Sequence, residues 1–179
     1  FSDPMTRNRL NESLSLIDEF SAPILDISGP NIFSREIGRV CSKKAGVELK
    51  VENTLECDFN DGIVAPGSGY RTIMCFEVIE HVMNPLALMR GIHKLLEPGG
   101  VVYLSTPRMP LISILSSTYH FTEYKESKIE ILFKWAGFEL EKKKTFNVFP
   151  WWIPFTGIRP LWKYIFQRYV IFKLRKPRT

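Results

Sequence analysis

The chain has 179 residues, 45% of them hydrophobic, and carries a net charge of +5. This length and composition fit one globular domain with a substantial core, and they exclude disorder as the default state. No uninterrupted apolar run is long enough to cross a bilayer as a helix.

The first part of the chain predicts a helix, a strand, a glycine-containing turn and a second helix. Apolar residues recur at helical spacing over Met5 to Phe20. Pro23 to Ile27 has the composition of a buried strand, and it leads into the turn Ser28-Gly29-Pro30-Asn31. A second helix then runs from Phe33 to Gly46. Val47 to Val51 alternates apolar with polar residues, as a strand does.

A strand, helix and strand unit follows the loop-rich stretch from Glu56 to Gly69. Ile73 to Phe76 is a short apolar run, and Asn84 with Pro85 supplies an N-cap and a first-turn proline for a helix. That helix ends at Pro98-Gly99-Gly100, before a second apolar strand from Val101 to Leu104. A crossover helix of this kind joins parallel strands with a right-handed connection, so the unit predicts a parallel sheet.

Polar residues gather where these two strands end. Ligands of open parallel sheets bind beyond the carboxyl ends of the strands, so we expect a site there. The residues at this edge are Glu77, Glu80, His81, Ser105 and Thr106.

The last part of the chain predicts one helix and two strands. The helix covers Glu123 to Ala136, and the strands cover Phe138 to Phe146 and Tyr169 to Leu174. The apolar residues of this helix are Ile129, Ile131, Leu132 and Trp135, and Gly137 follows it.

Basic charge is concentrated at the C-terminal end. Lys142 to Thr179 holds ten Lys or Arg and no Asp or Glu, whereas residues 1–141 hold 14 basic and 19 acidic residues. Residues 148–168 combine Arg and Lys with three tryptophans. This segment either packs over the sheet edge or forms an interfacial surface for anionic lipid or a lipid-linked acceptor. Single-stranded nucleic acid is a less favoured partner, because the aromatic residues outnumber the charges.

The motifs in this order resemble class I S-adenosylmethionine-dependent methyltransferases, in the branch similar to small-molecule enzymes of ubiquinone biosynthesis. The matching residues are E-V-I-E-H-V-x-N-P from Glu77, L-L-E-P-G-G from Leu95, S-T-P from Ser105, His120-Phe121-Thr122 and Ala136 to Phe138. The resemblance runs from about Ile24 to Phe146. It implies an α/β fold: a Rossmann-like, doubly wound, mostly parallel sheet with an antiparallel final strand. We expect one domain over residues 1–179, with an N-terminal helix in 1–22 and an aromatic, basic insertion at 147–168.

The resemblance also implies S-adenosylmethionine as cofactor, with S-adenosylhomocysteine as product, and it assigns binding roles. Asp26 would reach the methionine amino group or order the loop, and Glu52 would accept hydrogen bonds from the ribose hydroxyls. Asp58 and Phe59 would hold the adenine. Phe76 and Glu77 would line the methionine side.

The glycine motif after the first strand departs from the family pattern. The usual first and second glycines are Ser28 and Pro30 here, around Gly29. Glycine lets the backbone approach a cofactor closely, whereas proline fixes φ near about −65° and removes a donor. A methyltransferase-like binding or scaffold domain without turnover therefore stays open as an alternative.

The resulting hypothesis is methyl transfer to a small or lipid-linked acceptor, with oxygen the favoured atom. His81 is the candidate base, since imidazole titrates near neutrality, and capping the following turn is its competing role. No metal site is predicted. Three cysteines without C-x-x-C spacing, and first residues without a basic, apolar leader, favour a reducing cytoplasm, including the membrane surface there.

Overall fold

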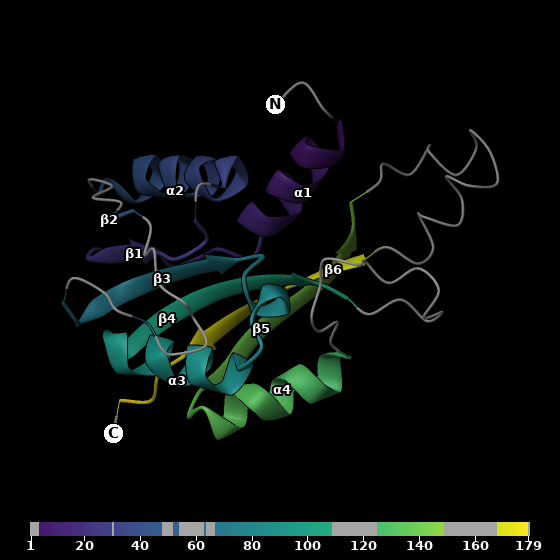
Figure 1. The fold of residues 1–179 in the computed structure, drawn as a ribbon. Coiled ribbons are helices and arrows are strands. Elements are labelled where there is room, and N and C mark those ends of the chain that lie inside the picture. Colours follow the sequence, from purple (N-terminus) through teal and green to yellow (C-terminus); the bar gives the residue numbers. More distant parts are fainter. Residues whose placement is uncertain are drawn as a thin grey trace.

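The computed structural model of the chain describes residues 4–29, 31–47, 52–53, 63, 67–108, 125–148 and 168–178. Its strands form one sheet in the order β2-β1-β3-β4-β6-β5 (Figure 1). They are β1 (Ile24–Asp26), β2 (Glu52–Asn53), β3 (Tyr70–Phe76), β4 (Leu96–Pro107), β5 (Glu139–Asn147) and β6 (Arg168–Arg175).

The strand directions confirm the predicted fold class. β1 pairs in parallel with β2 and β3, and β3 pairs in parallel with β4. The final strand, β6, runs antiparallel to both of its neighbours, β4 and β5. The sheet is therefore mostly parallel with an antiparallel last strand.

Four α-helices and one short 3₁₀ helix are described. They are α1 (Pro4–Leu14), α2 (Ile32–Ala45), η1 (Ile79–His81), α3 (Pro85–Leu95) and α4 (Glu126–Trp135). The Asn31 side chain accepts a hydrogen bond from the Phe33 amide at 2.9 Å and begins α2, which ends at Gly46 with φ 67°. Asn84 accepts from the Ala87 amide at 3.1 Å and begins α3, with Pro85 in its first turn, as the sequence predicts.

The first helix is shorter than the predicted span of Met5 to Phe20. It ends at Leu14, and the Ser15 hydroxyl donates to the Glu12 carbonyl at 2.7 Å. Such a local bond competes with continued helix formation. The chain then buries Leu16, Ile17 and Phe20 against the sheet without helical structure.

The start of β4 differs from the expected turn at Pro98-Gly99-Gly100. The helix ends at Leu95 and the strand begins at Leu96, so these residues lie in an irregular stretch where the register with β3 shifts. Gly99 has φ 84°, and a β-carbon at Gly100 would lie 3.0 Å from the Tyr70 carbonyl oxygen. Glycines fit there because a side chain would be strained or would clash.

The α4 helix buries only some of its apolar residues. Ile129 and Phe133 are buried, but Ile131 is 45% exposed and Trp135 is 68% exposed. Ile131 and Trp135 are four residues apart and therefore share a helix face, which points away from the sheet.

Helices cover both faces of the sheet, α1 and α2 on one and α3 and α4 on the other (Figure 1). Alternate residues of β3 divide accordingly: Ile73 and Cys75 join the cluster of the α3 and α4 face, and Met74 and Phe76 join the other. Within the described ranges, no helix has the length and apolar character needed to span a membrane. The carboxyl ends of β1, β3 and β4 and the start of β6 share one edge of the sheet, where the predicted site lies.

Candidate active site

The loop after β1 is ordered by its own polar side chains. Asp26 is buried, and its carboxylate accepts hydrogen bonds from the Ser28 amide at 2.9 Å and from the Ser34 hydroxyl of α2. The Ser28 hydroxyl in turn accepts from the Phe76 amide at 2.8 Å. Of the two roles considered for Asp26, these contacts support the ordering of the loop. Ser28, a departure from the glycine pattern, ties the loop to the end of β3.

Gly29 retains the backbone freedom that the motif requires. Its φ is 70°, in the left-handed region, and the Asn31 amide donates to its carbonyl at 2.7 Å. A β-carbon built at Gly29 would have no described atom within 4 Å beyond its chain neighbours. Among the described residues, the loop therefore leaves open space at its middle glycine.

The end of β3 presents Glu77 to the site and keeps Phe76 in the core. The Phe76 ring is fully buried and meets the Phe33 ring edge to face, with centroids 5.9 Å apart. Glu77 has φ 58°, an uncommon value for a residue with a side chain, and its amide donates to the Ser105 carbonyl at 3.0 Å. Of the two residues predicted to line the methionine side, Glu77 is the one with an accessible side chain.

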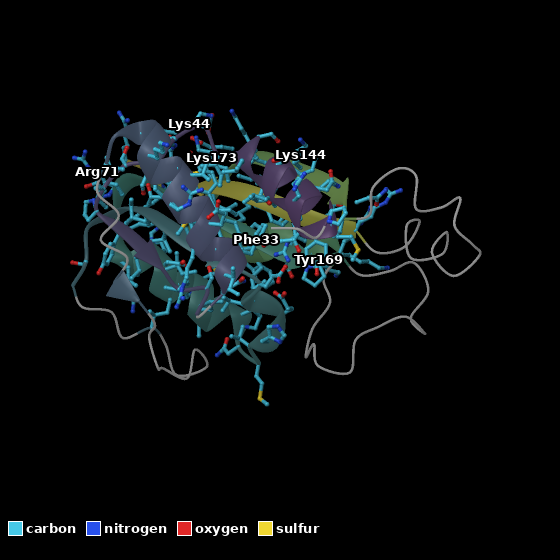
Figure 2. The ribbon with its side chains drawn as sticks, turned by 90° about the horizontal axis from the view of Figure 1, so that it is seen from above. Phe33, Lys44, Arg71, Lys144, Tyr169 and Lys173 are labelled. Carbon is cyan, nitrogen blue, oxygen red and sulfur yellow. The ribbon has the colours of Figure 1, made fainter. Side chains whose placement is uncertain are left out.

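Arg9 of α1 reaches this same edge. Its guanidinium forms an ion pair with the Glu77 carboxylate and lies over two aromatic rings, 4.0 Å from the centroid of Phe33 and 4.6 Å from that of Tyr169. Figure 2 looks down on this face and shows Phe33 and Tyr169 beside each other. Burial, and to a lesser extent the Glu77 charge, raises the pKa of Tyr169 to about 12.

These contacts went unrecognised in the sequence. Arg9, Phe33, Glu77 and Tyr169 lie on four segments far apart in the chain. The only available signal was the basic residue within an otherwise amphipathic first helix, which is too weak to identify a partner.

The acceptor side contains a buried carboxylate. Glu80 is 1% exposed, and its oxygen accepts from the Thr106 hydroxyl at 3.1 Å. Ser105 is equally buried, and its hydroxyl has no hydrogen-bond partner among the described residues. His81 ends the η1 helix with an exposed side chain, a position from which it can meet a ligand that approaches this edge.

Several predicted residues lie outside what the structure describes. Glu52 is placed by its backbone alone, opposite Leu25 of β1 and therefore at the site edge of the sheet. Asp58, Phe59, Pro30 and His120 lie outside the described residues, as does most of the aromatic and basic segment 148–168.

The described residues contain no cluster of His, Cys, Asp and Glu that could hold a metal ion. Cys41 and Cys75 are buried free thiols. Burial raises the pKa of Cys41 to about 11 and that of Cys75 well above its ordinary value, so neither is a reactive thiolate at neutral pH.

Comparison with known proteins agrees with this geometry. The sequence model of a methyltransferase domain family matches residues 7–150. The chain is 25% identical over 176 residues to the ubiquinone biosynthesis O-methyltransferase of Xanthomonas euvesicatoria pv. vesicatoria (strain 85-10), covering 80% of this chain and 73% of that protein.

Two solved structures show the same fold at low identity. The [4+2]-cyclase SpnF has a TM-score of 0.65 at 14% identity, covering 95% of this chain and 81% of its own. A phosphoethanolamine N-methyltransferase of Haemonchus contortus, in complex with S-adenosyl-L-methionine, has a TM-score of 0.61 at 15% identity. The match covers 95% of this chain and 52% of that one.

The strand order and the loops at the edge of the sheet define the class I methyltransferase fold, a Rossmann-like architecture with an antiparallel last strand. The family match covers most of the chain, and the chain belongs to the methyltransferase domain family. It is an S-adenosylmethionine-dependent methyltransferase by class.

Proposed function

We propose that this chain binds S-adenosylmethionine along the carboxyl ends of β1, β2 and β3 and transfers the methyl group to an oxygen of a small or lipid-linked acceptor. One observation carries the cofactor half of this proposal. Ser28 replaces a glycine without blocking the loop, because its hydroxyl accepts a hydrogen bond from the Phe76 amide. Gly29 keeps a φ of 70° and has open space beside it among the described residues.

Within the proposal, four residues recognise the parts of the cofactor. Glu52 accepts hydrogen bonds from the ribose hydroxyls, and Glu77 accepts one from the methionine amino group. Asp58 and Phe59 hold the adenine amino group and ring. Asp26 acts indirectly, because its carboxylate is committed to Ser28 and Ser34 and so sets the shape of the loop.

The cofactor supplies a methyl group on a sulfonium sulfur, which an oxygen nucleophile displaces in line. The protein has to align the acceptor oxygen, exclude water and remove the hydroxyl proton. His81 takes that proton in our proposal, because its imidazole is exposed at the acceptor side of the edge.

The name of the relative supports oxygen as the acceptor atom, since that protein is an O-methyltransferase of ubiquinone biosynthesis. The composition of residues 148–168 supports a lipid-linked acceptor and contact with an anionic membrane surface, because it combines tryptophans with Arg and Lys. We propose this segment as an insertion within a single domain.

Ligand binding and turnover test the two halves of the proposal separately. A hundredfold excess of S-adenosylhomocysteine over its dissociation constant should add about 2.7 kcal/mol to the free energy of unfolding. Transfer of a labelled methyl group to phenolic or catecholic acceptors should then occur, and His81→Ala should slow it without weakening cofactor binding. A thermal unfolding curve unchanged by millimolar ligand would contradict the cofactor site.

A second candidate is a methyltransferase-like binding domain without turnover, favoured by Pro30 at a glycine position of the cofactor loop. The two candidates differ in chemistry and not in fold. Binding of S-adenosylhomocysteine without methyl transfer to any acceptor of the panel, in the presence and absence of anionic vesicles, would favour the binding domain.

A further inference from the structure

The ion pair between Arg9 and Glu77 joins the first helix to the proposed cofactor site. The Arg9 side chain is 13% exposed and the Glu77 side chain 24%, so both charges have lost much of their hydration. Removal of either partner would leave a poorly hydrated charge, which makes such pairs sensitive to substitution. The pair is therefore a contact through which α1 and the end of β3 act on each other.

The surroundings of Arg9 fix the guanidinium and not the carboxylate. Phe33 from α2 and Tyr169 from β6 both lie within cation–π distance of the guanidinium. Glu77 instead has a backbone in the left-handed region, which costs free energy for a residue with a side chain. Among the described residues, Arg9 is the one that forms an ion pair with the Glu77 carboxylate, and Oε1 of Glu77 accepts no hydrogen bond. Its carboxylate position thus depends on Arg9.

The pair leaves acceptor capacity on Glu77. An ionised carboxylate has two oxygens and about four lone-pair positions. Arg9 is paired with the buried oxygen Oε1 through one of its terminal nitrogens, and the Glu77 side chain as a whole is the more exposed of the two. A ligand N–H can therefore reach Glu77 while Arg9 stays in place.

We propose that Arg9 is a positioning residue, which holds the Glu77 carboxylate where it accepts a hydrogen bond from the primary ammonium group of the cofactor's methionine. This rests on the proposed cofactor site. Docking of α1 and cofactor binding are then linked, because the same guanidinium serves both. Arg9 itself makes no contact with the cofactor carboxylate in this arrangement.

Three thioether ligands separate these contacts in the full chain. S-adenosylhomocysteine has the amino group and the carboxylate, S-adenosyl-3-thiopropylamine has the amino group alone, and 5′-methylthioadenosine has neither. Arg9→Gln should lower the affinity for each of the first two ligands by the same factor, about tenfold. This is the effect of losing one hydrogen bond to a charged group. Binding of the third should stay within about twofold. Isothermal titration calorimetry measures all three constants.

Two further variants control for folding and charge. Arg9→Lys retains a cation and should restore the affinity in part, while Arg9→Gln combined with Glu77→Gln should be no weaker than Glu77→Gln alone. Lys144→Gln removes a different anchor of α1, the 2.6 Å ion pair of Lys144 with Glu12. It should leave all three affinities unchanged. If Arg9→Gln does not fold, the lysine and Glu77 variants still decide the question.

Several results would overturn the inference. A loss for S-adenosylhomocysteine alone would mean that Arg9 binds the carboxylate directly. Unchanged or tighter binding of both amino ligands would mean that Arg9 does not position Glu77. An equal loss of affinity in Lys144→Gln would mean that any weakening of α1 docking lowers ligand binding, and that Arg9 has no specific role. Failure of the unaltered chain to bind any ligand would instead overturn the proposed function, and this inference with it.

Discussion

Helices α3 and α4 cover one face of the sheet through the larger apolar cluster, whereas α1 and the residues after it meet the other face through a smaller apolar cluster and a network of charged contacts. Phe133 of α4 meets Phe172 of β6 edge to face, with centroids 5.0 Å apart. On the opposite face, Lys173 of β6 pairs with Asp18, Glu19 and Glu141 at 3.0 to 3.1 Å. The face that carries Arg9 is therefore the more polar one.

The two faces therefore respond differently to pH and salt. Burial of apolar surface is insensitive to pH and non-directional. Ion pairs depend on protonation, geometry and salt, so the α1 face can be weakened while the α3 and α4 face stays folded. The positioning of Glu77 by Arg9 belongs to the adjustable face.

The largest expected effect lies on the apolar face. Phe133 is 1% exposed, so Phe133→Ala should lower the free energy of unfolding by about 3–5 kcal/mol, because it leaves a cavity against β6. Urea denaturation measures the loss. Trp135→Ala on the same helix is the matched control and should stay within about 0.5 kcal/mol, since that side chain is exposed. Equal losses in the two variants would contradict the division of α4 described above.

A smaller effect is expected on the charged face. Lys173→Met removes a cation that is 4% exposed but keeps the apolar stem, and its three carboxylate partners are exposed enough to be hydrated again. We expect a loss of about 1–2 kcal/mol in the free energy of unfolding.

Lys142→Met serves as the control for Lys173. Lys142 also pairs with Asp18, at 2.6 Å, but it lies at the surface, so its loss should cost at most about 1 kcal/mol. A cost for Lys173→Met as large as that of Phe133→Ala would mean that the two faces do not differ in kind.

The two faces should also differ in their response to acid. Hydrogen bonds from Arg175 hold the pKa values of Glu19 and Glu141 below the ordinary 4.5, and a hydrogen bond from Lys142 lowers the pKa of Asp18 from 3.8. Because these pKa values are depressed in the folded state, the pairs contribute stability at neutral pH. That stability is lost as the pH falls below about 4.5 toward the folded-state values.

Urea denaturation between pH 7 and pH 3 measures this loss. Lys173→Met should show a shallower pH dependence than the unaltered chain, because Lys173 helps to lower the same pKa values. Phe133→Ala should keep the original slope. If the free energy of unfolding of Lys173→Met changes with pH as steeply as that of the unaltered chain, Lys173 does not contribute to the acid response.

The sequence predicted what depends on neighbouring residues and missed what depends on distant ones. The unit from Ile73 to Pro107 was recognisable because its cap, apolar stripe and strands are local signals, although its glycines lie in an irregular strand start. Ser28 counted only as a departure, since its partner, the Phe76 amide, lies 48 residues away. The position of Arg9 in the first helix was too weak a signal to identify Glu77 as its partner, because Glu77 lies far away in the chain. Periodicity also could not tell which face of α4 would be covered.

The smallest expected effect compares the caps of two helices on opposite faces. Asn31→Ala and Asn84→Ala each remove a side chain that accepts an amide hydrogen at the start of a helix, so each should cost about 1 kcal/mol of unfolding free energy. Only Asn31 continues the proposed cofactor loop, since its backbone amide donates to the Gly29 carbonyl at 2.7 Å. Loss of the side-chain cap should loosen the end of that loop, so Asn31→Ala should also weaken the binding of S-adenosylhomocysteine, and Asn84→Ala should not. Equal affinities, measured by calorimetry at matched stability, would show that the loop keeps its shape without the cap.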